Sequence, residues 1–579
     1  MPAALGGPTQ RSTYRLLATF NGQVYAGVEG SGLSLYKFVP TAGPNGAWQP
    51  VGNTYTVQFR ALRASSTGLL IADNDYGVRR LDAAGTVRTV LPPSPSLILS
   101  DVLRARDGSY FLANGLLGLQ RAHPGTAQAT ETFVANGPAT SRVFSVLADA
   151  RTNTVDVFTG SYSERYLPGD GTYGFYEYAN NQWTNFTTQT YPQPADYPNP
   201  ARPVRGARTP DGTLYVAHFA GGLLEWKGVK DFRQFGAGTP GTPLLGTFGI
   251  RDRVEITDLA ATPEGKLWVV NRHLQPSLSG LFLFDPVATT WQTMPWSPGF
   301  EVLERIATDD VGNAWVSVSR KTDGTTGAPG IYAVDPTGAN APKFFSTSSG
   351  LPDNQIYDLV KDRRGYVWAA TIKGVAVFND PSGPFLSTIG FTQPRVERGE
   401  GTGFNTLYSE AVRAIAVDGG DRKWFGTDNG LWLFSPDANE ALLHLTTANS
   451  PLPSNRIVDV EVNDKTGEVW VATDAGVVAY RGSATITEGK PSCAAVFPNP
   501  VRPDFQGTVG ITGLANNATV KITDVAGHLV YATTAAGGTV TWNLTTPNGQ
   551  RVRSGVYLVL SADADGKNGC VSKVAVVGK

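Results

Sequence analysis

Charge is scarce in this chain, and the two signs cancel. Asp, Glu, Lys and Arg make up 17% of the 579 residues, below the roughly 25% of an average soluble domain. The 48 basic and 49 acidic residues leave no net field that would draw nucleic acid or an acidic membrane surface. We therefore expect no nucleic-acid partner.

Long apolar runs are absent as well. No stretch approaches the roughly 18 apolar residues that a membrane-spanning helix needs, so we expect no transmembrane segment. The first residues, Met1 to Pro8, have neither the basic head nor the apolar core of a signal peptide.

Histidine is too sparse for a recognisable active site. The five histidines have no close spacing to one another or to cysteine, which predicts neither a zinc site nor a triad. They are His123, His218, His273, His444 and His528. His218 and His273 come near the ends of strands where a ligand could bind, but surface or turn histidines are the simpler interpretation. We assign no catalytic, cofactor-binding or metal-binding residue and expect no cofactor and no enzyme.

The chain does have a repeat, clearest over residues 452–480. Three short strands are separated there by turns at Asn463 to Gly467 and Asp474 to Gly476. The same frame recurs around tryptophans 268, 315, 368, 424 and 470. A period of roughly 40 to 50 residues with several strands is typical of β-propeller blades. We interpret the tryptophans as packing between blades, and expect Thr371, Thr427 and Thr473 to bond backbone groups at strand ends.

Five weaker copies precede these five, so the sequence predicts ten blades between about residues 10 and 485. Because one ring usually closes with about four to eight blades, ten blades imply two rings. We expect residues 1–139 to form part of a first propeller and residues 140–485 a second propeller of seven blades. Together with the missing signal peptide, this count predicts an incomplete first ring and a natural start upstream of Met1.

A different module, residues 492–579, follows the repeats. About seven short alternating strands separated by Gly and Asn turns predict a small β-sandwich. The predicted fold class is therefore all-β, with tandem β-propellers followed by a C-terminal immunoglobulin-like β-sandwich.

The last module resembles the C-terminal sorting domain of Bacteroidetes proteins exported by the type IX secretion system. The matching residues are Phe497 to Pro500, Asp524 to Gly527, Trp542, Gly549, Ser554 to Tyr557 and Lys573 to Val577. His528 departs from the pattern, because Arg or Lys is commoner after that glycine. This resemblance implies export to the cell surface or outer membrane.

The repeats resemble two-component-regulator propellers, through the Leu-Pro-x-Asn-x-Ile, Asp-x-x-Gly-x-x-Trp and Thr-Asp-x-Gly elements of this sequence. Propellers joined to a sorting tail are similar to the PorZ-like family of type IX secretion surface proteins. That resemblance implies a non-enzymatic component of the attachment complex that binds lipopolysaccharide. It also implies a PorU-like sortase and PorV-like and PorQ-like outer-membrane proteins as partners.

An alternative function is a secreted propeller enzyme or carbohydrate-binding protein that uses the tail only for export. A sensor ectodomain is a weaker alternative, because neither a membrane helix nor a kinase follows the propellers. Residues 308–315 approximate the Asp-box of sialidase propellers, a turn-stabilising device that indicates fold rather than hydrolysis. Asp563 to Asn568 faintly resembles a calcium loop, for which a plain hairpin turn is the simpler interpretation.

The two cysteines of the chain, Cys493 and Cys570, both lie in the tail. Cys493 precedes the first strand of the predicted sandwich and Cys570 opens its last strand. These strands can be neighbours in an antiparallel sandwich, and the cell surface is an oxidising compartment. We therefore expect a disulfide between them.

Overall fold

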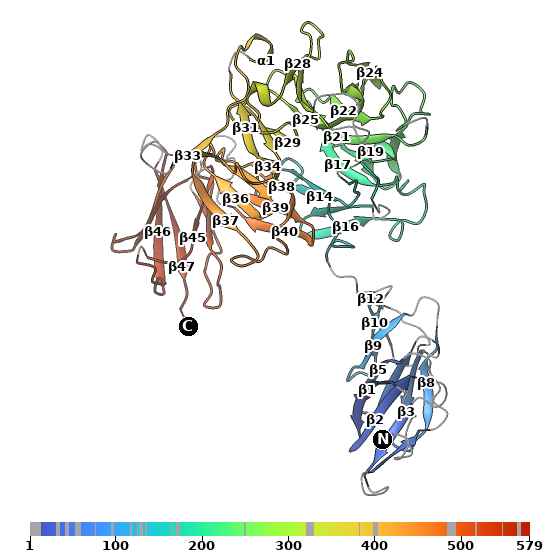
Figure 1. Ribbon diagram of the computed structural model, residues 1–579. Coiled ribbons are helices and arrows are strands. Elements are labelled where there is room, and N and C mark those ends of the chain that lie inside the picture. Colours follow the sequence, from blue (N-terminus) through green and yellow to red (C-terminus); the bar gives the residue numbers. More distant parts are fainter. Residues whose placement is uncertain are drawn as a thin grey trace. The chain divides into compact units, whose positions relative to one another are not determined.

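The computed structural model shows a chain built almost entirely of antiparallel β-sheets (Figure 1). It describes residues 13–578 except 30–34, 41–45, 52–58, 74, 76, 94–97, 116–117, 124–125, 127–130, 134–135, 164–165, 170–173, 248–249, 320–328, 381–382, 398–402, 483–493, 516–517, 536, 547 and 564–568. The chain divides into two compact units, Met1–Asn136 and Gly137–Lys579. Among the described residues, no helix is long and apolar enough to cross a membrane. The predicted all-β class with tandem propellers and a C-terminal β domain is confirmed.

The first unit contains three four-stranded blades, each a simple up-and-down meander. They are β1 (Thr13–Phe20), β2 (Gln23–Glu29), β3 (Leu35–Val39) and β4 (Ala47–Pro50); β5 (Phe59–Ser65), β6 (Gly68–Asp73), β7 (Gly77–Leu81) and β8 (Val87–Leu91); and β9 (Leu99–Arg104), β10 (Tyr110–Asn114), β11 (Gly118–Ala122) and β12 (Glu131–Phe133). The first strands of successive blades pack side by side, β1 on β5 and β5 on β9.

The second unit opens with blades of the same meander topology, and the described residues between 145 and 481 form seven of them. The first four are β13 (Ser145–Asp149), β14 (Thr154–Phe158), β15 (Phe175–Ala179) and β16 (Gln182–Phe186); β17 (Pro203–Arg208), β18 (Leu214–His218), β19 (Gly222–Gly228) and β20 (Asp231–Phe235); β21 (Glu255–Ala261), β22 (Leu267–Arg272), β23 (Leu281–Asp285) and β24 (Thr290–Thr293); and β25 (Leu303–Thr308), β26 (Ala314–Val318), β27 (Gly330–Val334) and β28 (Lys343–Phe345).

The other three are β29 (Ile356–Lys361), β30 (Val367–Thr371) and β31 (Gly374–Phe378); β34 (Val412–Val417), β35 (Lys423–Thr427), β36 (Gly430–Phe434) and β37 (Ala441–Leu445); and β38 (Ile457–Asn463), β39 (Glu468–Thr473) and β40 (Gly476–Arg481). An insertion after β31 carries the short helix α1 (Gly383–Leu386) and the hairpin of β32 (Arg395–Glu397) and β33 (Gly403–Asn405). Two 3-10 turns, η3 (Phe300–Val302) and η4 (Thr347–Ser349), connect blades.

These seven blades close into a ring. The inner strand of each blade packs on that of the next, and the last, β38, packs on the first, β13. The Val146 backbone N–H donates to Oδ2 of Asp459 at 3.0 Å across this junction. Trp470 of the last blade contacts the rings of Tyr178 and Trp183 of the first, with centroids 5.0 and 6.0 Å away.

The repeated tryptophans lie between blades, as the sequence predicts, and none of the five is more than 4% exposed. Before three of them, Trp315, Trp368 and Trp424, an aspartate six residues earlier caps the preceding turn. Asp362 accepts the backbone N–H of Arg364 and Tyr366 and the indole N–H of Trp368 at 2.9–3.0 Å. Asp309 caps the corresponding turn before Trp315 in the same way, so the Asp-box-like residues are a turn device. Asp418 caps the turn before Trp424, where it accepts the backbone N–H of Gly420 and of Arg422 at 2.9 and 3.1 Å.

The strand-end threonines also lie as predicted. The hydroxyl groups of Thr371, Thr427 and Thr473 donate to the carbonyl oxygens of Gly374, Gly430 and Gly476 at 2.8–3.0 Å. Each glycine has a positive φ, between 99° and 139°, which side-chain-bearing residues rarely adopt. The Thr-x-x-Gly element therefore closes the tight hairpin between the second and third strands of these blades.

The C-terminal domain is a two-sheet sandwich. One sheet has the order β41-β42-β45 and the other β44-β43-β46-β47. The strands are β41 (Ala495–Phe497), β42 (Val509–Thr512), β43 (Thr519–Asp524), β44 (Leu529–Thr534), β45 (Thr539–Trp542), β46 (Gly555–Ala562) and β47 (Cys570–Val576). Alternate residues such as Val520 and Ile522 enter a core built around the fully buried Trp542.

The sorting-domain motif residues hold turns and strand junctions of this sandwich. The Asn499 amide bridges β47, accepting from Ala575 N at 3.0 Å and donating to Lys573 O at 2.8 Å. Asp524 accepts the backbone N–H of Ala526 and of His528, which shapes the turn at Gly527. His528 adds a side-chain contact of 2.9 Å to the same carboxylate.

The disulfide stays a prediction, because Cys493 lies outside the described residues. Ala494, the next residue, lies beside β47, since its carbonyl oxygen accepts the Ser572 hydroxyl at 2.5 Å. Ser572 is two residues beyond Cys570, so the backbone on both sides supports the pairing.

Candidate functional site

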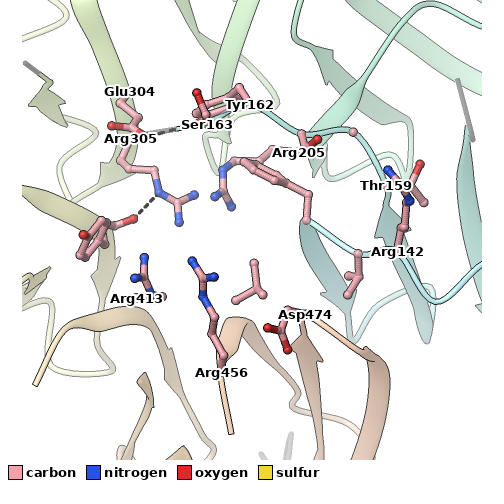
Figure 2. A pocket seen from close by; sticks show the side chains of 16 residues that line it. Arg142, Thr159, Tyr162, Ser163, Arg205, Glu304, Arg305, Arg413, Arg456 and Asp474 are labelled. Atoms are coloured by element: carbon pink, nitrogen blue, oxygen red, sulfur yellow. Dashed lines mark hydrogen bonds between the residues drawn. The ribbon is translucent and has the colours of Figure 1, made fainter. Parts of the chain in front are cut away.

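A cavity of about 540 Å³ lies at one mouth of the seven-bladed ring (Figure 2). Because the strands of a blade are antiparallel, the first residues of its inner strand and the last residues of its second strand lie at the same end of the blade. The cavity is lined by residues from both kinds of position. They are Arg142 to Phe144, Thr159 to Ser163, Arg205, Glu304, Arg305, Tyr357, Arg413, Arg456, Val458 and Asp474.

β-Bulges shape this mouth. Six of the seven inner strands, all but β13, shift register near their first residues. An extra residue in one strand re-aims the side chains around it. Tyr357, Arg413 and Val458 occupy the extra position of their strands and line the cavity.

Five of the seven blades place a charged residue within or directly after the bulge. We call these residues the belt: Arg205, Asp258, Arg305, Asp358 and Asp459. Its oppositely charged atoms approach to 3.4–3.9 Å from blade to blade. A second hollow of about 360 Å³ in the same channel is lined by all five belt residues.

The belt aspartates also tie neighbouring blades through the backbone. Each accepts the N–H of the next residue in its own strand and one N–H of the following blade, at 2.9–3.1 Å. The blade-to-blade donors are Ile306, Ile415 and Val146. Each belt carboxylate is therefore tied to two backbone N–H groups, one in its own strand and one in the following blade, which gives it a structural role.

Burial changes the proton affinity of the belt. It raises the pKa of Asp258 to about 7, against the opposing charge of Arg205. The pKa values of Asp358 and Asp459 are raised for the same reason. For Arg205, burial favours the neutral form, but Asp258 and Asp459 outweigh it and raise the guanidinium pKa. Arg205 thus remains a cation at the floor of the mouth.

The arginines are held by different partners. Arg413 makes two bonds to Asp428, at 2.7 and 2.9 Å, and lies over the Tyr357 ring. Arg305 donates to the Tyr357 carbonyl at 2.5 Å. Arg205 stacks over Phe144 with its guanidinium carbon 5.4 Å from the ring centre. Nε of Arg205 is buried and has no hydrogen-bond partner within the described parts of the chain.

A buried polar wall flanks the mouth. Glu304 accepts hydrogen bonds from the hydroxyl groups of Tyr162 and Tyr166, at 3.4 and 2.5 Å. The Arg272 guanidinium lies 3.8 Å from the centre of the Tyr166 ring. Burial raises the pKa of Glu304. The wall fixes the segment that carries Tyr162 over the channel.

His218 and His273 do not line the cavity at the mouth. The prediction that they lie at the surface or in turns is wrong, because their side chains are buried. Both are fully buried. His218 contacts the Val216 carbonyl through Nδ1 at 3.1 Å, and burial lowers its pKa to about 3. His273 accepts the Gln275 N–H at 3.0 Å. They are buried because β18 and β22 are covered by neighbouring blades on both faces.

The other histidines that the sequence singles out do not line the mouth of the ring. His123 pairs with Glu131 at 2.5 Å and His444 stacks on Trp432 at 3.6 Å between ring centres. Residues 564–568, which hold most of the calcium-like loop, lie outside the described part of the chain. Within the described part, no group of three or more His, Cys, Asp or Glu side chains could hold a metal ion.

Reasoning from the sequence missed the arginine mouth, although a signal was present. Arg205, Arg305, Arg413 and Arg456 all stand within three residues of the start of an inner strand. A comparison of the repeats at that register would have found them. Their convergence depends on bulges, which no residue type marks.

Comparisons with known proteins agree with this architecture. Residues 495–576 match the family model of the secretion system C-terminal sorting domain, and residues 350–373 match that of the two component regulator propeller. No curated protein sequence matches the chain.

Solved structures give the fold. PorZ of Porphyromonas gingivalis, described as an essential surface component of the type-IX secretion system, is 22% identical. The match covers 97% of this chain and 75% of PorZ with a TM-score of 0.69. The extracellular domain of a hybrid two component system of B. thetaiotaomicron is 13% identical over 99% of this chain and 79% of its own, with a TM-score of 0.39. Virginiamycin B lyase of Staphylococcus aureus is 10% identical over 58% of this chain and 94% of the lyase, with a TM-score of 0.38.

The sorting-domain match associates the chain with the type IX secretion system and with export to the cell surface. Its fold is similar to that of PorZ over nearly its whole length. In fold and in its C-terminal domain, this chain therefore resembles a PorZ-like protein of the type IX secretion system, as its sequence predicts.

Proposed function

We propose that this protein is a non-enzymatic, cell-surface component of the type IX attachment complex in a member of the Bacteroidetes. It binds lipopolysaccharide and supports the sortase that processes and anchors cargo. The observation that carries the proposal is a sorting domain at residues 495–576 that follows a PorZ-like propeller fold.

Several features support a binding role over catalysis. The belt carboxylates are occupied by backbone N–H donors. The mouth above them is dominated by guanidinium groups, which bind and orient anions and do not act as acids or bases at neutral pH. Such a mouth suits an anionic glycan better than a hydrolytic reaction.

The proposed partners at the outer membrane are a PorU-like sortase and PorV-like and PorQ-like proteins. The test is affinity capture of the tagged, surface-exposed chain from membranes of its own host, with the lipid retained on the chain analysed by mass spectrometry. We expect enrichment of the sortase and of lipopolysaccharide relative to an unrelated tail-bearing protein. Equal recovery of both on the two baits would contradict the proposal.

The alternative is a cargo protein, either an enzyme or a carbohydrate-binding protein, that is exported through the same tail. The carboxyl-rich channel is the feature that favours an enzyme. A cargo protein would be recovered without the sortase once its own processing is complete.

A further inference from the structure

Guanidinium groups from several blades converge on the open mouth of the ring. Figure 2 shows Arg205, Arg305, Arg413 and Arg456 directed toward the centre of the cavity. They come from β17, β25, β34 and the residue before β38. Like charges brought together in this way repel one another unless an anion lies between them.

Some guanidinium N–H groups of these arginines donate no hydrogen bond to a nearby carboxylate. The closest carboxylate oxygens to the Arg205 guanidinium are 3.7 and 3.9 Å away, beyond hydrogen-bond length, and each of these oxygens already accepts one backbone N–H. Arg456 is 3.5 Å from Asp428, whose oxygens already accept Arg413. Arg205 and Arg456 therefore have N–H groups to offer a ligand.

Aromatic side chains position the arginines without consuming their N–H groups. Arg205 lies over Phe144, and Arg413 lies over Tyr357 with 5.0 Å to the ring centre. Stacking leaves the planar fork of Arg205 available to a phosphate or carboxylate, whereas the fork of Arg413 is held by Asp428. The same wall includes Tyr162 and several hydroxyl-bearing residues, which are the groups that contact sugar rings.

We propose that the mouth of the seven-bladed ring binds a sugar that carries a phosphate or carboxylate group, with Arg205 and Arg456 contacting the anion. The cavity volume falls in the range of roughly 300–1,000 Å³ of small-molecule sites. The inference rests on the proposed function, because lipopolysaccharide is a source of such sugars, and it names the site at which that function would be exercised.

The test uses small probes on the full chain, with affinity measured by calorimetry at low salt. The probes are glucose 1-phosphate, glucuronate, inorganic phosphate and neutral glucose. We expect glucose 1-phosphate or glucuronate to bind, and whichever binds identifies the anion. Binding of glucose as tight as that of both anionic sugars, or of phosphate as tight as that of glucose 1-phosphate, would overturn the proposal.

The variant for this test is Arg142→Ala with Arg456→Ala. Both residues lie at the exposed rim, and the Arg456 side chain is 54% exposed, so the ring should fold normally. The matched control is Arg395→Ala, an exposed arginine of the β32 hairpin that does not line the mouth. We expect the rim variant to lose about tenfold or more in affinity, as expected for charged hydrogen bonds. Unchanged affinity in a normally melting rim variant would overturn the proposal.

A parallel measurement with lipopolysaccharide purified from the host separates the two proposals. If the rim variant binds lipopolysaccharide as tightly as the unaltered protein, the mouth is not the site, while lipopolysaccharide binding stands. If anionic sugars bind through the rim arginines but lipopolysaccharide does not bind, the mouth proposal stands and lipopolysaccharide binding fails.

Discussion

A buried ion pair between Asp362 and Lys423 joins two neighbouring blades. Both side chains are fully buried, and Nζ of Lys423 lies 2.9 Å from Oδ2 of Asp362. Burial alone would raise the pKa of Asp362, but Lys423 and the hydrogen bonds from Trp368 and the turn hold it below its usual value. The pair ties the capped turn of one blade to the second strand of the next.

Replacing Asp362 with Ala should therefore cost about 3 kcal/mol of ring stability, because the buried ammonium keeps only Asp421, 3.1 Å away, as a carboxylate partner. The control is Asp309→Ala in the adjacent blade, where a turn of the same kind has no lysine partner within the described residues. That change should cost about 1 to 2 kcal/mol. Denaturant unfolding of the ring measures both, and equal losses would contradict the role of the pair.

His218 should make ring stability depend on pH. Burial lowers the folded pKa of His218 to about 3, below the 6.5 of a free imidazole, so the unfolded chain binds the proton more readily. The stabilisation is complete above pH 6.5 and is lost as the pH falls toward 3. Between pH 7 and pH 5, the unfolding free energy relative to His218→Asn should fall by about 2 kcal/mol. A difference that stays constant across this interval would show that His218 is not buried in its neutral form.

At the scale of elements, the strand order, the buried tryptophans and the hairpin threonines follow from local pattern. Alternation and Gly turns in the sequence determine them. The bulges of the inner strands cannot be predicted from local pattern, because an extra residue in a strand is not marked by any particular residue type. The arginine mouth and the belt depend on those bulges, so the site was not predictable although each Arg and Asp is plain in the sequence.

The disulfide prediction concerns the two ends of the tail sandwich. Ala494, the residue after Cys493, lies beside β47, the strand that begins at Cys570. Thiol titration of unreduced, denatured protein should find no free thiol. Reduction should lower the stability of the tail by on the order of 4 kcal/mol in the chain-entropy estimate, because a long loop is opened. Two titratable thiols in unreduced protein would refute the bond.

At the scale of the whole molecule, the division into 1–139, 140–485 and 492–579 is a proposal that limited proteolysis can test. The two compact units separate between Asn136 and Gly137. We expect early cleavage near this boundary, releasing a resistant fragment that starts near residue 137. Early cuts within the blades would contradict this division.

The repeat period and the change of pattern near residue 483 were enough to predict propellers and a tail. The number of blades followed from the period alone. Ring closure, however, depends on contacts such as that between Val146 and Asp459, which are 313 residues apart. No local pattern links such positions, so the repeats alone do not determine how the blades divide between rings.

The central claim, that the protein belongs to the secretion machinery and is not cargo, is tested most directly by deleting its gene in its own host. The quantity to measure is the fraction of other tail-bearing surface proteins whose sorting domain has been removed, by mass spectrometry of their C-termini. The account predicts that these proteins keep their tails and fail to anchor, and that the intact gene restores processing. Normal tail removal and anchoring in the deletion strain would contradict it and leave the cargo function in its place.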